Sequence, residues 1–468
     1  MLSTMADTST LAGIILAAGK GTRMKSELPK CLFSVCGLPM AEHIGRALKT
    51  LGVEKPILVV GWNGEMLQQS LDPESYLFAW QHEQLGTAHA AIMAIEHLRG
   101  MSGNVIVSPG DTPLLDAESL GELVKKHKDS KALATIATFE LDDPTGYGRV
   151  VRNENKVVGI VEHKDATQVE RAIREVNSAV YCFDIETLLR LLPQVTNDNA
   201  QQEYYLTDVI KMIADEGGIV ETQVYPSADI FRGVNDRWQL AEASQVMRMA
   251  ILKRHALQGV SIVDPQTTFI GADVEIQPET VIHPMTALEG RCRIGAACHI
   301  GPQSILVDCQ IGDECTVLMS HVNRATMEDG SRCGPYAHLR PKSVVGKRSK
   351  IGNFVELKNA QLGEGVSVGH LTYLGDAAVG AGTNVGAGTI TCNYDGVNKH
   401  PTVVGENVFI GSNSTLIAPV KLGTGSFIGA GSVVTHDVQD DALALGRAKQ
   451  VEKEGWARQR RQKTEQVK

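Results

Sequence analysis

The stretch from Ile270 to Leu306 reads IGADVEIQPETVIHPMTALEGRCRIGAACHIGPQSIL, with an aliphatic residue at every sixth position. The same period returns near the end of the chain, and glycine often follows the aliphatic residue. The aliphatic positions are Ile270, Ile276, Ile282, Leu288, Ile294, Ile300 and Leu306, then Val404, Ile410, Leu416, Leu422, Ile428 and Val434. Neither an α-helix nor an alternating strand has this period, whereas the triangular coils of a parallel β-helix do. We therefore predict a left-handed parallel β-helix of hexapeptide repeats over residues 259–468, including a C-terminal tail.

Two segments break this period. One lies near residues 320–345, and the other, TCNYDGVNKHP, runs from Thr391 to Pro401. Segments that leave a regular solenoid often carry function, so we expect a loop at each break.

The composition limits the classes of function. The chain has 468 residues and a net charge of −9, which predicts more than one domain and argues against general nucleic-acid binding. Its nine cysteines include no C-x-x-C pair, so we expect reduced thiols in a cytoplasmic protein. Cys292 and Cys298, like Cys309 and Cys315, are six residues apart, which the repeat explains better than a zinc site does. We expect no membrane span.

Short apolar runs alternate with amphipathic stretches before residue 236. Three runs read as buried strands and one stretch as a helix: LAGIILA (Leu11–Ala17), KPILVVG (Lys55–Gly61), NVIVSPGD (Asn104–Asp111) and PMAEHIGRALKTLG (Pro39–Gly52). This alternation predicts an α/β, Rossmann-like domain over residues 1–235, with a mostly parallel sheet. The segment 236–258 has neither glycine nor proline and has helical periodicity, so we expect a linker helix there.

The segment ILAAGKGTRMKSELPK, Ile15 to Lys30, combines a glycine turn with four basic residues. It fits neither the P-loop nor the dinucleotide pattern G-x-G-x-x-G. A glycine turn at the end of a strand lets backbone N–H groups approach phosphate oxygens, and the basic residues balance the charge of a triphosphate. The sequence PGD, Pro109 to Asp111, also follows a strand, so both segments should face one crevice at the carboxyl edge of the sheet.

These residues carry a specific resemblance. The pattern L-A-A-G-x-G-T-R-M…L-P-K is similar to that of the sugar-phosphate nucleotidylyltransferases. With the repeats, four further motifs resemble the bacterial GlmU family from Leu11 to about Trp456: QLGTAHA (Gln84–Ala90), DDPTGYGR (Asp142–Arg149), GIVEHKDA (Gly159–Ala166) and EYYLTD (Glu203–Asp208). The resemblance implies a bifunctional enzyme that acetylates glucosamine 1-phosphate with acetyl-CoA. It then transfers uridylyl from UTP with Mg²⁺, releases pyrophosphate and yields UDP-N-acetylglucosamine, a precursor of peptidoglycan and lipopolysaccharide.

The resemblance also implies the uridylyltransferase residues. The nucleotide and its phosphates would contact Leu16, Ala17, Ala18, Gly19, Arg23 and Lys30, the uracil Gln81, Gly86 and Thr87, and the N-acetylglucosamine moiety Gly148, Glu162 and Asn177. Asp111 and Asn235 would hold Mg²⁺, which needs few protein ligands when a nucleotide supplies other oxygens. Taken singly, Asp111 could cap a turn, Asn235 could cap the linker helix and Glu162 could be a surface charge. The chain departs from the family at Pro109, where an aromatic residue is usual.

For the acetyltransferase, the resemblance implies His370 as the catalytic base, and Glu356 is expected to orient it. The sugar phosphate would bind to Arg340, Lys358, Tyr373 and Asn384, and acetyl-CoA to Ala387, Asn393, Tyr394, Ser412, Ala430 and Arg447. An imidazole suits this role because an amine attacks a thioester only when it is neutral. Family members form homotrimers with the acetyl site between subunits, so we expect the same assembly here.

Two other functions fit parts of the sequence. A nucleotidylyltransferase could use its β-helix only as an assembly or regulatory platform. A platform has no use for a base such as His370 or for the Asn393–Tyr394 loop. A non-enzymatic β-helix protein would leave the glycine turn unexplained.

Overall fold

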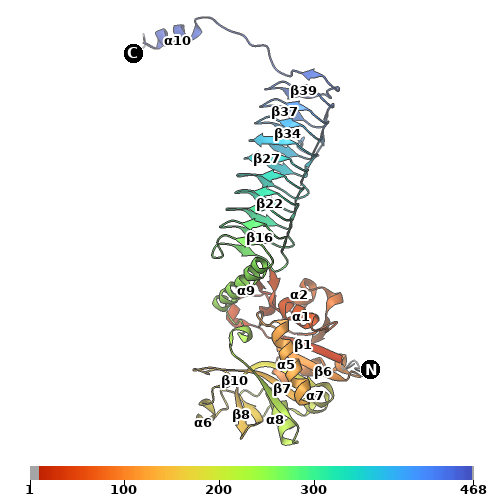
Figure 1. The fold of residues 1–468 in the computed structure, drawn as a ribbon, viewed down its shortest axis with the longest axis vertical. Coiled ribbons are helices and arrows are strands. Elements are labelled where there is room, and N and C mark those ends of the chain that lie inside the picture. The colour runs from red at the N-terminus through yellow and green to blue at the C-terminus, as the bar shows by residue number, and fades with distance from the viewer. Residues whose placement is uncertain (1–9, 466–468) are drawn as a thin grey trace. The chain divides into compact units, whose positions relative to one another are not determined.

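The computed structural model describes residues 10–465 (Figure 1). The chain divides into two compact units, and the boundary lies between Ala250 and Ile251. This boundary falls within helix α9 (Arg237–Leu257), in the segment where the sequence predicts a linker helix. Among residues 10–465, no helix is long and apolar enough to cross a membrane.

A nine-stranded sheet forms the centre of the first unit, and its main path runs in the order β11-β7-β10-β6-β1-β4-β5. These strands are β11 (Val220–Tyr225), β7 (Ala134–Glu140), β10 (Glu175–Asp184), β6 (Gly103–Pro109), β1 (Thr10–Ala17), β4 (Ile57–Val60) and β5 (Leu77–Trp80), and β8 (Arg149–Asn153) and β9 (Lys156–Val161) extend the sheet beside β10. β1 is parallel to β4 and β6, whereas β10 is antiparallel to β6 and β7. Leu16 pairs with both Val59 and Pro109, so three strands end at the same edge.

Helices cover both faces of this sheet. One apolar core includes residues of α1 (Met40–Thr50) and α5 (Ala117–Ser130), and the other includes residues of α3 (Thr87–Met93), α7 (Ile185–Leu191) and α8 (Thr207–Asp215). Ile14 of β1 belongs to one core and Ile15 to the other, because successive side chains of a strand point to opposite faces. Full burial of each is worth about 1.5–3 kcal/mol. The predicted α/β architecture is confirmed.

Three parallel sheets, of eleven, ten and nine strands, form the second unit. The first sheet runs from β12 (Ser261–Ile262) to β41 (Leu443–Ala444), the second from β13 (Phe269–Ile270) to β40 (Val433–Val434) and the third from β14 (Glu275–Ile276) to β38 (Val420–Leu422). Ile270 pairs with Leu288 and Ile282 with Ile300, so residues one coil apart lie side by side. The strands stack along the axis of the solenoid (Figure 1). The predicted hexapeptide β-helix is confirmed.

The coils continue without a loop through residues 320–345, so the expectation of a loop there is wrong. This segment forms β22 (His321–Asn323), β23 (Thr326–Met327), β24 (Arg332–Cys333), β25 (His338–Leu339) and β26 (Val344–Val345). The buried inward residues Val317, Val322 and Met327 are five residues apart, because two sides of the coil are one residue short at this point. The second predicted break is present: residues 393–401 lie between β34 (Ile390–Cys392) and β35 (Thr402–Val404).

The four cysteines of the early coils lie inside the solenoid. Cys309 donates its backbone N–H to Sγ of Cys292 (3.5 Å), and Sγ of Cys298 donates to the Gly312 carbonyl (3.1 Å). Cys315 is also buried. In the described part of the chain, no three side chains of His, Cys, Asp and Glu form a cluster that could hold a metal.

Candidate active sites

The glycine turn begins where β1 ends, and a small core holds it in place. Met24 is 1% exposed and packs with Phe33 and Val234. Gly21 has a φ of +57°, and a Cβ at this position would lie 2.7 Å from Cβ of Lys30. Glycine is therefore required where the turn passes beneath Lys30.

The predicted nucleotide contacts at the end of β1 border open space. The Leu16 carbonyl accepts a hydrogen bond from the Gly110 N–H (2.8 Å), and Ala17 and Ala18 are buried. Gly19 is exposed, and a Cβ there would meet nothing within 4 Å. This arrangement leaves room for phosphate groups beside Gly19, at the carboxyl edge of the sheet.

Four predicted residues converge in the crevice at this edge. Nζ of Lys30 contacts Oδ2 of Asp111 and donates to Oδ1 of Asn235 (3.1 Å). Nη2 of Arg23 donates to the same oxygen of Asn235 (2.8 Å). The Val234 N–H donates to the Asp111 carbonyl (2.9 Å), which ties the two segments together. A carboxylate oxygen and an amide oxygen that meet at one cation fit the preference of Mg²⁺ for hard oxygen ligands.

Asn235 does not cap the linker helix. Asp236 does so, because its Oδ1 accepts the Gln239 N–H (2.9 Å). Asn235 donates its own N–H to Oε1 of Gln239 (2.7 Å) and its Nδ2 to the Gly233 carbonyl (3.2 Å). The first bond holds the backbone of Asn235, and the second holds its side-chain amide with Oδ1 toward Lys30.

The predicted uracil residues lie after β5 and at the start of α3. The buried Gln81 donates from Nε2 to the Gly86 carbonyl (3.1 Å). Gly86 has a φ of +118°, and a Cβ there would lie 2.5 Å from the Tyr204 carbonyl oxygen. Oγ1 of Thr87 accepts the Leu206 N–H (3.0 Å). The EYYLTD motif thus packs against the LGT segment, and two motifs far apart in sequence form one wall.

The predicted sugar residues share a hollow of about 780 Å³ with Arg23 and the two predicted metal ligands. Its lining includes Arg23, Asp111, Gly148, Glu162, Asn177 and Asn235. A Cβ at Gly148 would lie 3.3 Å from Oε1 of Glu162, so these two residues are in contact range. The pairing of β10 with β7 shifts register between Asn177 and Tyr181, and Nδ2 of Asn177 donates to the Tyr181 hydroxyl (2.7 Å). This irregularity lets a strand residue face the hollow.

Glu162 is a half-buried residue of this hollow and not a surface charge. Burial raises the pKa of its carboxyl, and the nearby charges of Asp165, Asp208 and Glu203 raise it further. Both effects disfavour the charged form of the carboxyl. The side chain is thus a ready partner for the polar groups of a sugar.

Pro109 ends β6 and lines the same hollow. Its carbonyl accepts a hydrogen bond from Oγ1 of Thr112 (3.1 Å). Asp111 still contacts Lys30, so the proline in place of an aromatic ring leaves this contact intact.

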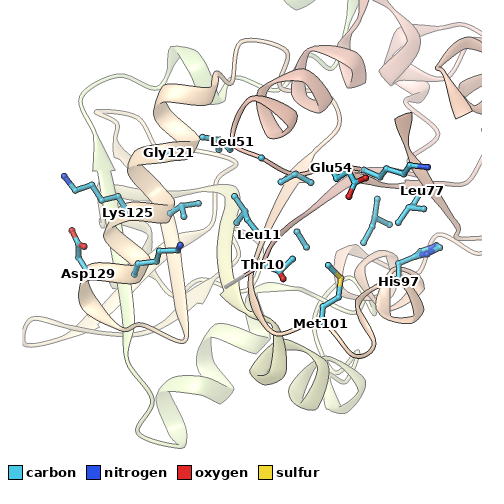
Figure 2. A pocket seen from close by; sticks show the side chains of 17 residues that line it. Thr10, Leu11, Leu51, Glu54, Leu77, His97, Met101, Gly121, Lys125 and Asp129 are labelled. Carbon is cyan, nitrogen blue, oxygen red and sulfur yellow. The ribbon is translucent and has the colours of Figure 1, made fainter. Parts of the chain in front are cut away.

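A second hollow, of about 840 Å³, lies at the amino-terminal edge of the sheet (Figure 2). Leu11 of β1, Ile57 of β4 and Leu77 of β5 line it, together with His97. Its lining includes none of the residues that the sequence predicts for catalysis or binding. The predicted chemistry belongs to the carboxyl edge, where ligands of such sheets bind.

Four predicted residues of the second unit form one column. The column runs along four neighbouring strands of the first sheet: β30 (Ser367–His370), β33 (Asn384–Val385), β36 (Phe409–Ile410) and β39 (Phe427–Ile428). The strand before them in this sheet is β27 (Lys350–Asn353), and the adjacent strands of the second sheet are β28 (Glu356–Lys358) and β31 (Tyr373–Gly375). The register of the first sheet places His370, Ala387, Ser412 and Ala430 at the same position of successive coils. Nη1 of Arg447 donates to the Ala430 carbonyl (3.0 Å). The predicted base and three of the predicted acetyl-CoA contacts thus lie along one line.

Within the chain it is Asn353 that contacts His370, and the role of Glu356 in orienting the imidazole stays a prediction. Asn353 pairs with His370 in register, and its Oδ1 contacts Nδ1 of the imidazole. Because an amide oxygen can only accept, Nδ1 carries the hydrogen, and in the neutral form of the imidazole Nε2 then keeps its lone pair. Glu356 accepts instead from Nη1 of Arg340 (2.8 Å). The signal that identifies Asn353 is its register position one coil before His370.

Cations gather on the second sheet. Arg340 and Lys358 occupy equivalent positions on adjacent coils, and Tyr373 follows Glu356 in the same ladder. Lys399, from the 393–401 loop, lies beside Lys358 and lowers its pKa. The sequence prediction did not include Lys399, because the loop has no period that could place it. Three cations suit a phosphate dianion.

The remaining predicted residues lie in the loop and on another sheet. Nδ2 of Asn393 donates to Oδ2 of Asp376 (2.5 Å), which anchors the loop to the coils. Tyr394 is 60% exposed. Asn384 belongs to the first sheet and Tyr373 to the second, so one chain does not bring these two residues onto the same face.

Comparisons with known proteins agree with both parts of the fold. Residues 12–226 match the family model of nucleotidyl transferases, and residues 401–436 match that of bacterial transferase hexapeptide repeats. The chain is 49% identical to the bifunctional protein GlmU of Geobacillus thermodenitrificans, over 95% of this chain and 96% of that protein. It is 47% identical to the protein of the same name from Listeria monocytogenes serotype 4a, over 95% and 97%, and 45% identical to that of Brevibacillus brevis, over 96% and 97%. The resemblance seen in the sequence is confirmed, and the chain belongs to the GlmU family of bifunctional proteins.

Proposed function

We propose that the chain makes UDP-N-acetylglucosamine in two steps, one in each unit. The second unit acetylates glucosamine 1-phosphate with acetyl-CoA, and the first then transfers uridylyl from UTP to N-acetylglucosamine 1-phosphate. The observation that carries this proposal is the column from His370 to Ala430, which begins one coil after Lys358 and two coils after Arg340. All nine cysteines are free thiols, which supports a reducing, cytoplasmic setting.

In the acetyl transfer, His370 acts on the amine. As the neutral amine attacks the thioester carbonyl of acetyl-CoA, Nε2 takes a proton from the attacking nitrogen. The C–S bond then breaks, and the protonated imidazole supplies a proton to the departing thiolate. Asn353 keeps Nδ1 as the donor and Nε2 as the acceptor. Arg340, Lys358 and Lys399 would hold the phosphate of the sugar.

In the uridylyl transfer, a phosphate oxygen of the sugar attacks the α-phosphorus of UTP, and pyrophosphate leaves. The protein has no covalent step to perform, so it positions the reactants and balances their charge. Arg23 and Lys30 would bind phosphate oxygens, while Asp111 and Asn235 would hold Mg²⁺. Bound Mg²⁺ would reduce the negative charge of the triphosphate and of the leaving pyrophosphate.

We propose a homotrimer whose acetyl sites lie between subunits. The rings of Tyr336 and Phe354 stack on successive coils (5.3 Å between centroids), and Leu371, next to His370, is 62% exposed. Exposed apolar residues that line up in this way are typical of protein interfaces. A neighbouring subunit would also supply Asn384 to a site that contains Tyr373. Light scattering that shows a fully active monomer in acetyl transfer would contradict this assembly.

One experiment tests both activities. The purified protein receives glucosamine 1-phosphate, acetyl-CoA, UTP and Mg²⁺, and each component is omitted in turn. We expect UDP-N-acetylglucosamine only from the full mixture, and free coenzyme A whenever the first two substrates are present. If N-acetylglucosamine 1-phosphate is uridylylated but glucosamine 1-phosphate is never acetylated, the β-helix is a platform.

A further inference from the structure

The ammonium group of Lys30 contacts both side-chain oxygens that are proposed to bind Mg²⁺. Nζ of Lys30 contacts Oδ2 of Asp111 and donates to Oδ1 of Asn235 (3.1 Å). The side chains of Lys30 and Asp111 are each 16% exposed, so water screens their attraction only in part. Two cations cannot occupy the same point between these oxygens.

We infer that Lys30 competes with the metal for Asp111 and Asn235, and that nucleotide phosphates relieve this competition. The inference rests on the proposed uridylyltransferase function, which makes Lys30 a phosphate-binding residue. When the phosphates of UTP attract Lys30, its ammonium leaves the two oxygens, and a metal ion can take its place. The metal and the nucleotide therefore strengthen each other's binding, as linked sites must.

The local geometry supports an exchange of this kind. The backbone at Lys30 starts a turn of 3₁₀ helix (Lys30–Leu32), and the glycine turn packs so closely against it that a Cβ on Gly21 would lie 2.7 Å from Cβ of Lys30. The side chain has a flexible four-carbon stem, so the ammonium can swing toward the open space beside Gly19. Asp111 keeps a cationic partner before and after the exchange, which avoids an uncompensated charge in a half-buried site.

The test measures metal binding without turnover. Mn²⁺ prefers the same oxygen ligands as Mg²⁺, and its free concentration can be followed by electron paramagnetic resonance in the absence of nucleotide. We expect Lys30→Met to bind Mn²⁺ at least about tenfold more tightly than the wild type, because the competing charge is gone. Lys125→Met, an equal loss of charge on helix α5, should bind Mn²⁺ like the wild type.

Further variants make the result interpretable. Lys30→Gln retains an N–H donor for Asp111 and should also gain affinity, so the test survives if Lys30→Met folds poorly. Mn²⁺ should raise the melting temperature of each folded Lys30 variant more than that of the wild type. If neither variant gains affinity while Asp111→Ala weakens Mn²⁺ binding, the metal site stands and the competition is refuted. If the gain persists in Lys30→Met combined with Asp111→Ala, the metal binds elsewhere, and the proposed metal site fails instead.

Discussion

The contact between Asn353 and His370 leads to a quantitative prediction about the acetyl transfer. Asn353→Ala removes the oxygen that holds Nδ1–H and leaves the imidazole free to turn. A hydrogen bond of this kind is worth about 0.5–1.5 kcal/mol net, which corresponds to a loss of about 2- to 13-fold in kcat. Removal of the base itself, in His370→Ala, should cost about 10²- to 10⁴-fold. The Michaelis constant for acetyl-CoA should change little in either variant, because both residues act on the amine.

The double variant decides whether Asn353 acts through His370. Release of coenzyme A is followed with a thiol reagent for the wild type, both single variants and the double variant. If Asn353 only orients the imidazole, Asn353→Ala should have no further effect once His370 is alanine. Uridylyl transfer from ready-made N-acetylglucosamine 1-phosphate serves as the control, since the other unit performs it. An equal loss from Asn353→Ala in both backgrounds, or no loss in either, would refute the reasoning.

Three further variants test other parts of the two sites. Asp111→Ala should abolish uridylyl transfer while acetyl transfer continues, as measured by separate assays, and loss of both would indicate a folding defect instead. Because the pKa of Glu162 is raised, its charged form costs stability above the ordinary pKa of a glutamate and not below it. Glu162→Gln should therefore raise the melting temperature at pH 8 and change it little near pH 4, whereas equal shifts would contradict the burial argument. Lys399→Ala should raise the Michaelis constant for glucosamine 1-phosphate by about tenfold and keep kcat, and a fall in kcat alone would argue against a phosphate contact.

The repeat could be predicted because one physical rule governs it. Each inward side chain, such as Ile300 or Leu306, is fully buried, so its aliphatic character is required at every sixth position. The same rule misled the prediction near residues 320–345. Two sides with five residues each, from Val317 to Met327, shift the period without changing the coil. A shifted period and a true loop look alike in the sequence, and only the strand register distinguishes them.

The sites were less predictable than the fold, because they depend on register and on loops. Asn353 and Glu356 both precede His370 by roughly one coil, and their positions in the sequence do not show which one contacts the imidazole. The 393–401 loop makes the steps of the column unequal: Ala387 to Ser412 is longer than the other two by the length of the inserted residues. Lys399 lies in that loop, where no period constrains its side chain. In the first unit, only the fold brings Lys30, Asp111 and Asn235 together.

The column in the β-helix suits a long cofactor that reacts at one of its ends only. Coils stack at the spacing of β-strands, about 4.8 Å, so the three steps from His370 to Ala430 span about 14 Å along the axis. An extended cofactor that lies parallel to this axis places its thioester at one end and its charged groups at the other. His370 lies at the first end, and Arg447, bound to the Ala430 carbonyl, lies at the second. The side chains of Ala387, Ser412 and Ala430 are small. They therefore do not project into the space that a cofactor lying along the column would occupy. On the proposed function, the regular solenoid would supply a straight track for acetyl-CoA, while Arg340 and Lys358 of the coils and Lys399 of the loop would bind the sugar phosphate.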